Sequence, residues 1–180
     1  EFYQDKNIPV DDNVVLITVH RRENHGERLD RILDAIETLV KKYSNHHFVL
    51  PVHPNPNVKD KVHCRLEKYS NVYLLKPLDY PYLVYLMKHA KLILTDSGGI
   101  QEEAPSFGCP TLVMRYETER QEGINAGVSV LVGAEYDKIV SLSSEILDKT
   151  RQDSRLQAAN PYGKGDSSKI IEGLIREYFA

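Results

Sequence analysis

The sequence predicts an α/β fold, a Rossmann-like parallel sheet with helices on both faces. Six short apolar runs, rich in β-branched residues and bounded by turn residues, have the composition of strands buried on both faces. Helical patterns lie between them, and this alternation implies right-handed crossovers and a parallel sheet. Polar clusters follow several of the runs directly, at the sheet edge where such folds bind ligands. The predicted strands are 14–19, 48–52, 72–75, 92–95, 111–114 and 128–132.

The predicted helices show one apolar face each. The clearest follows the first strand, with a three-and-four spacing that places one face on a sheet. Its apolar residues are Leu29, Ile32, Leu33, Ile36, Leu39 and Val40. The same pattern recurs over 137–149 and 167–178. Between these two, residues 160–166 predict a rigid turn, in which Asp166 or Ser167 can cap the last helix.

Composition narrows the class of protein. With 180 residues, 41% hydrophobic and 27% charged, the chain matches a globular domain, and we expect one domain over 1–180. A net charge of −3 without a long basic run argues against nucleic-acid binding. No apolar stretch is long enough to span a bilayer, and the polar start is unlike a signal peptide, so we expect a cytoplasmic location. Cys64 and Cys109 lack metal-ligand spacing and predict two reduced, partly buried thiols.

A glycine turn follows the fourth predicted strand, in the segment Asp96-Ser97-Gly98-Gly99. Glycine lets a ligand approach the backbone, and the unpaired N–H groups of the helix that follows suit an anion. One turn later, Glu102 or Glu103 could accept hydrogen bonds from a sugar or ribose diol. The motif alone fits an ordinary strand-to-helix turn equally well.

Two histidines follow the first and second predicted strands. His20 opens the polar loop 20–26 and should point into the crevice, where it could contact a phosphate oxygen or transfer a proton. The alternative is a solvated loop with an Arg–Glu pair. His53 lies in a loop that Pro51 and Pro54 stiffen, and taken alone a structural role is the commoner one.

Two further loops carry candidate binding groups. In 114–123, Arg115 and Arg120 lie among carboxylates that could hold each guanidinium against a pyrophosphate, although an exposed charged loop fits as well. In 77–87, aromatic and aliphatic side chains could stack on a flat base. The spacing of Tyr85 and Leu86 favours helix core instead.

Taken together and in order, these loops resemble the C-terminal half of the non-hydrolysing UDP-N-acetylglucosamine 2-epimerases. The matching motifs are His-Arg-Arg-Glu-Asn at 20–24, Asp-Ser-Gly-Gly-Ile-Gln-Glu-Glu-Ala-Pro at 96–105, Thr-Glu-Arg at 118–120 and Asn-Pro-Tyr-Gly at 160–163. The resemblance implies a glycosyltransferase-B type fold, of which this chain is the second half. Residues 1–12 would then be the interdomain linker, 160–180 the C-terminal turn and helix, and the N-terminal catalytic domain would be absent from the chain.

The resemblance also implies roles for individual residues. Ser97, Gly98 and Gly99 would hold the diphosphate, and Glu103 would bind the ribose hydroxyls. His20, as a catalytic residue, and Arg120 would face the phosphates or the sugar, and Leu83 would lie near the uracil. Arg21 and His53 would contact a possible allosteric activator. Many members have proline where this chain has Gln121, which predicts a more mobile loop.

The family's reaction inverts C2 of the sugar by eliminating UDP and adding it back to the other face. The acid and base carboxylates come mainly from the N-terminal domain in this family, so we expect this chain to bind UDP or UDP-sugar without turning it over alone. The implied partners are UDP-N-acetylglucosamine, UDP and the missing domain, in a full-length homodimer that serves cell-surface polysaccharide synthesis. We expect no cofactor and no metal.

Three alternatives remain open at this stage. The chain could be the nucleotide-sugar-binding half of a glycosyltransferase, which needs no loop like 20–24. It could be a UDP-sugar sensor module that acts without an N-terminal domain. A hydrolysing relative that releases free N-acetylmannosamine is disfavoured by the His20 loop.

Overall fold

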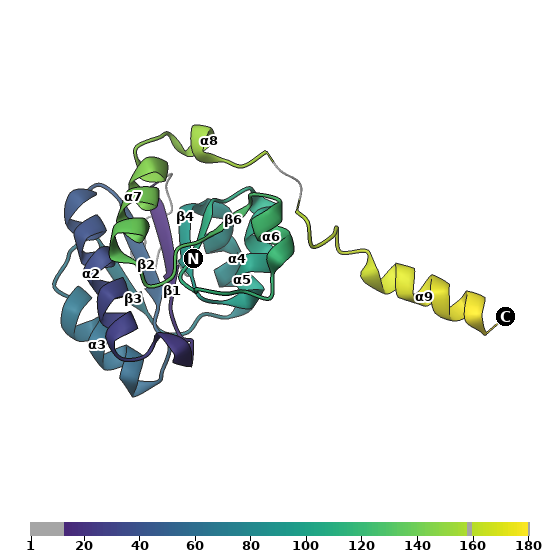
Figure 1. Ribbon diagram of the computed structural model, residues 1–180, viewed down its shortest axis with the longest axis horizontal. Coiled ribbons are helices and arrows are strands. Elements are labelled where there is room, and N and C mark those ends of the chain that lie inside the picture. The colour runs from purple at the N-terminus through teal and green to yellow at the C-terminus, as the bar shows by residue number, and fades with distance from the viewer. Residues whose placement is uncertain (1–12, 158–159, 180) are drawn as a thin grey trace.

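The computed structural model describes residues 13–157 and 160–179 and contains a six-stranded parallel sheet in the order β3-β2-β1-β4-β5-β6 (Figure 1). The strands are β1 (Val14–Thr18), β2 (His47–Pro51), β3 (Val72–Leu75), β4 (Ala90–Thr95), β5 (Thr111–Val113) and β6 (Ser129–Leu131). Each of the six predicted runs is therefore confirmed as a strand. The predicted linker 1–12 lies outside the described residues.

Helices cover both faces of the sheet, as predicted. They are η1 (Arg22–Asn24), α2 (Glu27–Lys42), α3 (Pro56–Leu66), α4 (Tyr80–His89), α5 (Gly98–Glu103), η2 (Ala104–Phe107), α6 (Gln121–Asn125), α7 (Tyr136–Leu147), α8 (Arg151–Ser154) and α9 (Ser167–Tyr178). Because strand side chains alternate, Val15 and Ile17 of β1 face a core shared with α2, α3 and α7. Val14 and Leu16 face a second core shared with α4, α5 and η2.

The strand order creates a crevice at the centre of the sheet. The chain starts in β1, runs outward through β2 and β3, and then returns to β4 on the other side of β1. Connections therefore leave β1 and β4 in opposite directions, which separates the loops after these two strands. Thr18 pairs in register with Thr95, so both strands end at the same level. The loops that follow them form the walls of the candidate site.

Two sequence expectations about helices need correction. Leu86 is fully buried, whereas Tyr85 is 41% exposed and lies against the His89 ring, so only Leu86 belongs to the core. Asp166 occupies the N-cap position of α9, but its side chain makes no capping hydrogen bond.

Helix α9 extends away from the sheet (Figure 1). It has the predicted bounds, and its apolar residues are exposed, Ile170 by 56% and Leu174 by 60%. Within the described part of the chain, the helices all lack the length and apolarity needed to cross a membrane.

Candidate functional site

The site is organised around Asp96, the fully buried residue that follows β4. Its carboxylate accepts hydrogen bonds from the backbone N–H of His20 at 3.0 Å and of Arg21 at 2.9 Å. The buried Asn24 side chain donates to the same carboxylate at 3.0 Å and to the Met114 carbonyl at 3.0 Å. Three loops, after β1, β4 and β5, are thus held together by two side chains. Asp96 was not among the predicted site residues, although its place directly after a buried strand is an available signal, since a buried charge needs partners.

A cavity of 430 Å³ opens at this edge of the sheet. It brings together six of the residues predicted for the site: His20, His53, Leu83, Ser97, Gly99 and Glu103. Apolar groups, among them Leu78 and Ile100, complete the wall. A polar rim on an apolar cavity suits a ligand with both a flat apolar part and a charged part.

His20 is held in a partly buried position at the cavity wall. Its ring stacks on His53 with 5.8 Å between centroids, and its Nε2 lies 3.7 Å from Asp96 Oδ1, beyond hydrogen-bonding distance. Burial lowers the pKa of His20 below the ordinary histidine value of 6.5; Arg21 and His53 also lower it, while Asp96 opposes them. The lowered pKa favours the uncharged imidazole, which is able to accept a proton.

Gly98 is the point where the cationic groups approach the backbone. A Cβ atom built at this position would lie 3.4 Å from Arg120 Cζ, from Arg21 Nη2 and from Glu119 Oε1. Any larger side chain would displace the guanidinium groups from the start of α5. Arg21, Gly98 and Arg120 thus form a cluster beside the cavity, and none of the three lines it.

Carboxylates hold both arginines of the 114–123 loop, as predicted. The Arg120 Nε donates to Glu102 at 2.6 Å, and its Nη1 pairs with Glu119 at 2.6 Å. Arg115 is paired with Glu23 and Glu119. Glu23 of the 20–26 loop therefore pairs with an arginine of another loop, Arg115, while His20 of the same loop lines the cavity.

Glu102 and Glu103 have different surroundings. Glu102 is occupied by Arg120, whereas Glu103 lines the cavity and accepts a hydrogen bond from the Tyr80 hydroxyl at 2.9 Å. Tyr80 belongs to the 77–87 segment considered for base stacking, but its hydrogen bond to Glu103 was not predicted, because only the packed fold brings the two side chains together.

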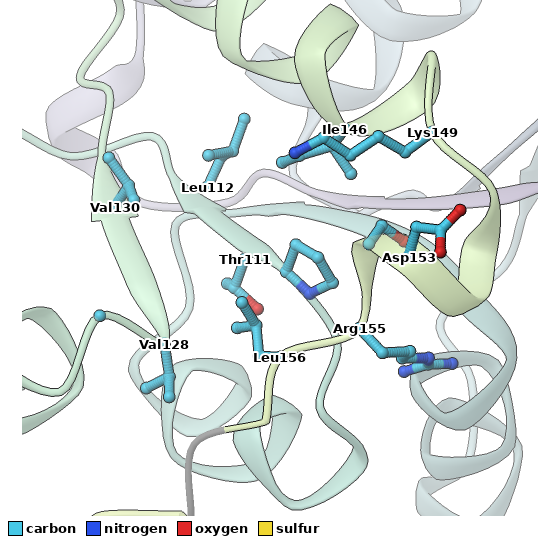
Figure 2. A pocket seen from close by; sticks show the side chains of 12 residues that line it. Thr111, Leu112, Val128, Val130, Ile146, Lys149, Asp153, Arg155 and Leu156 are labelled. Atoms are coloured by element: carbon cyan, nitrogen blue, oxygen red, sulfur yellow. The ribbon is translucent and has the colours of Figure 1, made fainter.

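A second cavity, of 240 Å³, lies at the amino ends of β5 and β6. Figure 2 shows that side chains such as Leu112, Ile146 and Leu156 line it. Two of its charged neighbours have other partners: Arg155 donates to the Phe107 and Lys88 carbonyls, and Asp153 accepts from Thr150. Within the described residues, no group of three or more His, Cys, Asp or Glu side chains could hold a metal ion.

Comparison with known proteins finds a family model and several relatives that match most of this chain. The family model described as UDP-N-acetylglucosamine 2-epimerase matches residues 2–176. The UDP-N-acetylglucosamine 2-epimerase of Neisseria meningitidis is 46% identical over 165 residues, which cover 91% of this chain and 44% of that protein. Its crystal structure bound to UDP-GlcNAc superposes with a TM-score of 0.83 at 44% identity, covering 92% of this chain and 45% of that one. The co-structure of S. aureus MnaA with UDP gives 0.87 at 38% identity, covering 94% and 47%. The chain thus spans about half the length of these relatives.

Proposed function

Since the chain belongs to the UDP-N-acetylglucosamine 2-epimerase family, we propose that it forms the UDP-binding half of an enzyme that converts UDP-N-acetylglucosamine to UDP-N-acetylmannosamine. It corresponds to the C-terminal half of that enzyme, and an N-terminal half completes the cleft. The complete enzyme is a cytoplasmic homodimer that needs no cofactor and no metal. Relatives of known structure support the assignment of a uridine nucleotide as the ligand, because one contains UDP-GlcNAc and another contains UDP.

One observation carries the proposal: two guanidinium groups converge on Gly98 at the start of α5. A diphosphate at Ser97, Gly98 and Gly99 would receive backbone N–H donors from the helix start and charge-assisted hydrogen bonds from Arg120. Glycine at position 98 makes this approach possible, because a Cβ there would already contact both arginines.

The remaining parts of the nucleotide fit the 430 Å³ cavity. Glu103, held by Tyr80, is oriented to accept hydrogen bonds from the ribose hydroxyls. Leu83 and its apolar neighbours in the cavity wall would pack against the uracil. With the nucleotide in this position, the sugar would lie towards His20.

Epimerisation needs a proton removed from C2 and the C1–O bond to UDP broken, which leaves a 2-acetamidoglucal. Negative charge develops on the departing diphosphate oxygen, and the cluster at Gly98 can stabilise it. His20, whose lowered pKa favours the neutral imidazole, is the catalytic residue of this half and faces the sugar or its phosphate. UDP then adds to the opposite face of the double bond and C2 regains a proton. The carboxylates that move the proton at C2 belong to the N-terminal half, so this chain binds the nucleotide without turning it over.

Arg21 and His53 are proposed to contact a second UDP-sugar molecule that activates the enzyme. His53 lines the 430 Å³ cavity and Arg21 lies beside Gly98, so both are next to the site proposed for UDP.

Calorimetric titration of the chain with UDP, UDP-N-acetylglucosamine and NAD tests the proposal. We expect both uridine ligands to bind and NAD not to bind. Ser97→Ala and Glu103→Ala should each weaken UDP binding roughly tenfold, as loss of hydrogen bonds to a charged partner implies. Ser141→Ala and Glu145→Ala, exposed on α7, are the matched controls. Absence of uridine binding, or equal effects of site and control variants, would contradict the proposal. Formation of UDP-N-acetylmannosamine by this chain alone would contradict its assignment as an incomplete half.

A further inference from the structure

The Asn-Pro-Tyr-Gly turn at 160–163 folds back onto the site. The Asn160 side chain donates to the Glu102 carbonyl at 3.2 Å and to the Ser106 hydroxyl at 2.7 Å. Its side-chain oxygen accepts from the Tyr162 backbone N–H at 3.0 Å. One side chain therefore attaches the turn to α5 and η2 and also fixes the conformation of the turn itself.

The Tyr162 hydroxyl lies between two backbone groups at the start of α6. It donates to the Arg120 carbonyl at 3.1 Å and accepts from the Gly123 N–H at 2.9 Å. The residue at position 123 has no room for a side chain, because a Cβ there would lie 2.6 Å from this hydroxyl. The Tyr162 hydroxyl thus bonds one backbone group at the N-cap of α6, Arg120, and one within its first turn, Gly123.

Both ends of Arg120 are consequently held by this turn. Tyr162 holds the Arg120 carbonyl, and Glu102, which pairs with the Arg120 guanidinium, has its own carbonyl bound by Asn160. Tyr162 is half-buried and does not line the 430 Å³ cavity, so it would not touch a nucleotide there. Tyr162 would therefore act on a ligand through the groups that it holds, and of these Arg120 is the one that lies beside Gly98.

We propose that Tyr162 is a positioning residue, whose hydroxyl fixes the backbone of Arg120 so that the guanidinium meets the diphosphate of bound UDP. The proposal rests on the proposed function, because it requires UDP to bind at Gly98. It predicts that loss of the Tyr162 hydroxyl weakens the interactions with the phosphates and leaves those with the nucleoside intact.

This prediction is tested with the Tyr162→Phe variant, by measuring the dissociation constants of UDP and of uridine by NMR titration of the chain. UDP affinity should fall roughly tenfold, since two hydrogen bonds that order the arginine are lost. Uridine affinity should stay within about twofold. A purely structural role would lower both affinities by the same factor. Tyr136→Phe is the matched control, because it removes an exposed hydroxyl whose partner is Thr38, on α2.

Gly123→Ala provides a second, independent variant. Its Cβ would displace the Tyr162 hydroxyl, so UDP affinity should fall as in Tyr162→Phe, although alanine favours the helix. Added to Tyr162→Phe, the same substitution should have little further effect, because the nearest remaining ring atom would lie 3.4 Å from the Cβ. In an Arg120→Ala background, Tyr162→Phe should leave UDP affinity unchanged.

The outcomes separate this inference from the proposed function. A wild-type chain that binds no UDP overturns both. A wild-type chain that binds UDP, with equal losses of UDP and uridine affinity in Tyr162→Phe or with no loss of either, overturns the role of Tyr162 alone. A further loss of UDP affinity on adding Tyr162→Phe to Arg120→Ala also overturns it.

Discussion

The buried side-chain amide of Asn24 donates to Asp96 Oδ2 at 3.0 Å and links the loop after β1 to the end of β4. The same amide donates to the Met114 carbonyl just beyond β5. Since β1, β4 and β5 are neighbours in the sheet, this pair fixes the ends of three adjacent strands relative to one another. The candidate site therefore has a rigid base, from which His20 and Ser97 project.

Removal of the Asp96 carboxylate should destabilise the fold strongly. Asp96→Ala leaves the His20 and Arg21 N–H groups and the Asn24 amide without their acceptor in a buried position. We expect the free energy of unfolding, measured by urea denaturation, to fall by about 2–4 kcal/mol. Asp60→Ala, at an exposed position on α3, should change it by less than about 0.5 kcal/mol. Similar values for the two variants would mean that Asp96 does not anchor these loops.

The pKa of His20 should be measurably low in the folded chain. Burial is the main cause, and NMR titration of the imidazole should give a midpoint below 6.5. His53→Gln should raise the midpoint, because His53 contributes to the lowering. The folded state then binds the proton more weakly than the unfolded state, so the contribution of neutral His20 to stability is present above pH 6.5 and is lost as the pH falls. A midpoint at or above 6.5 would contradict the burial of this ring.

Glu37 should make stability depend on pH below 5. Although burial raises its pKa, hydrogen bonds from Arg65, Lys68 and Tyr69 lower it to about 2, compared with 4.5 for a free glutamate. Its contribution is therefore complete above pH 4.5 and declines as the pH falls towards 2. Wild-type protein should have a higher urea midpoint than Glu37→Gln at pH 7, and the difference should shrink between pH 5 and pH 3. A constant difference across this range would refute the ionic role of Glu37.

Only one of the two cysteines should react with a thiol reagent in the native state. Cys64 is exposed, whereas Cys109 is fully buried and burial raises the pKa of its thiol to about 12. This corrects the expectation that both thiols are partly buried. Labelling with a chromogenic disulfide should modify one thiol rapidly, and Cys64→Ser should abolish that phase. Rapid modification of two thiols in folded protein would contradict the burial of Cys109.

The strands and long helices could be predicted because their apolar patterns are local. The start of β4 shows what local sequence patterns could not predict. The strand begins at Ala90, earlier than predicted, and includes the buried Lys91. The Lys91 amine donates to the Leu147 carbonyl on α7, a partner that periodicity cannot reveal.

The candidate site was predictable where a residue lies just beyond the carboxyl end of a strand. His20 and Ser97 each lie two residues beyond the last residue of β1 and of β4, and parallel strands place these ends together. Tyr80 and Tyr162 were not predictable, since their partners Glu103 and Arg120 lie 23 and 42 positions away in sequence. Only the packed structure brings such pairs into contact.

The most direct test of the central claim is to map UDP binding on the ¹⁵N-labelled chain by NMR. We expect the largest chemical-shift changes at the backbone amides of Ser97, Gly98 and Gly99, with smaller ones at His20. Amides at the second cavity, such as Val128 and Val130, should not change. Changes confined to the second cavity, or no changes at saturating UDP, would contradict a nucleotide site at the carboxyl ends of β1 and β4.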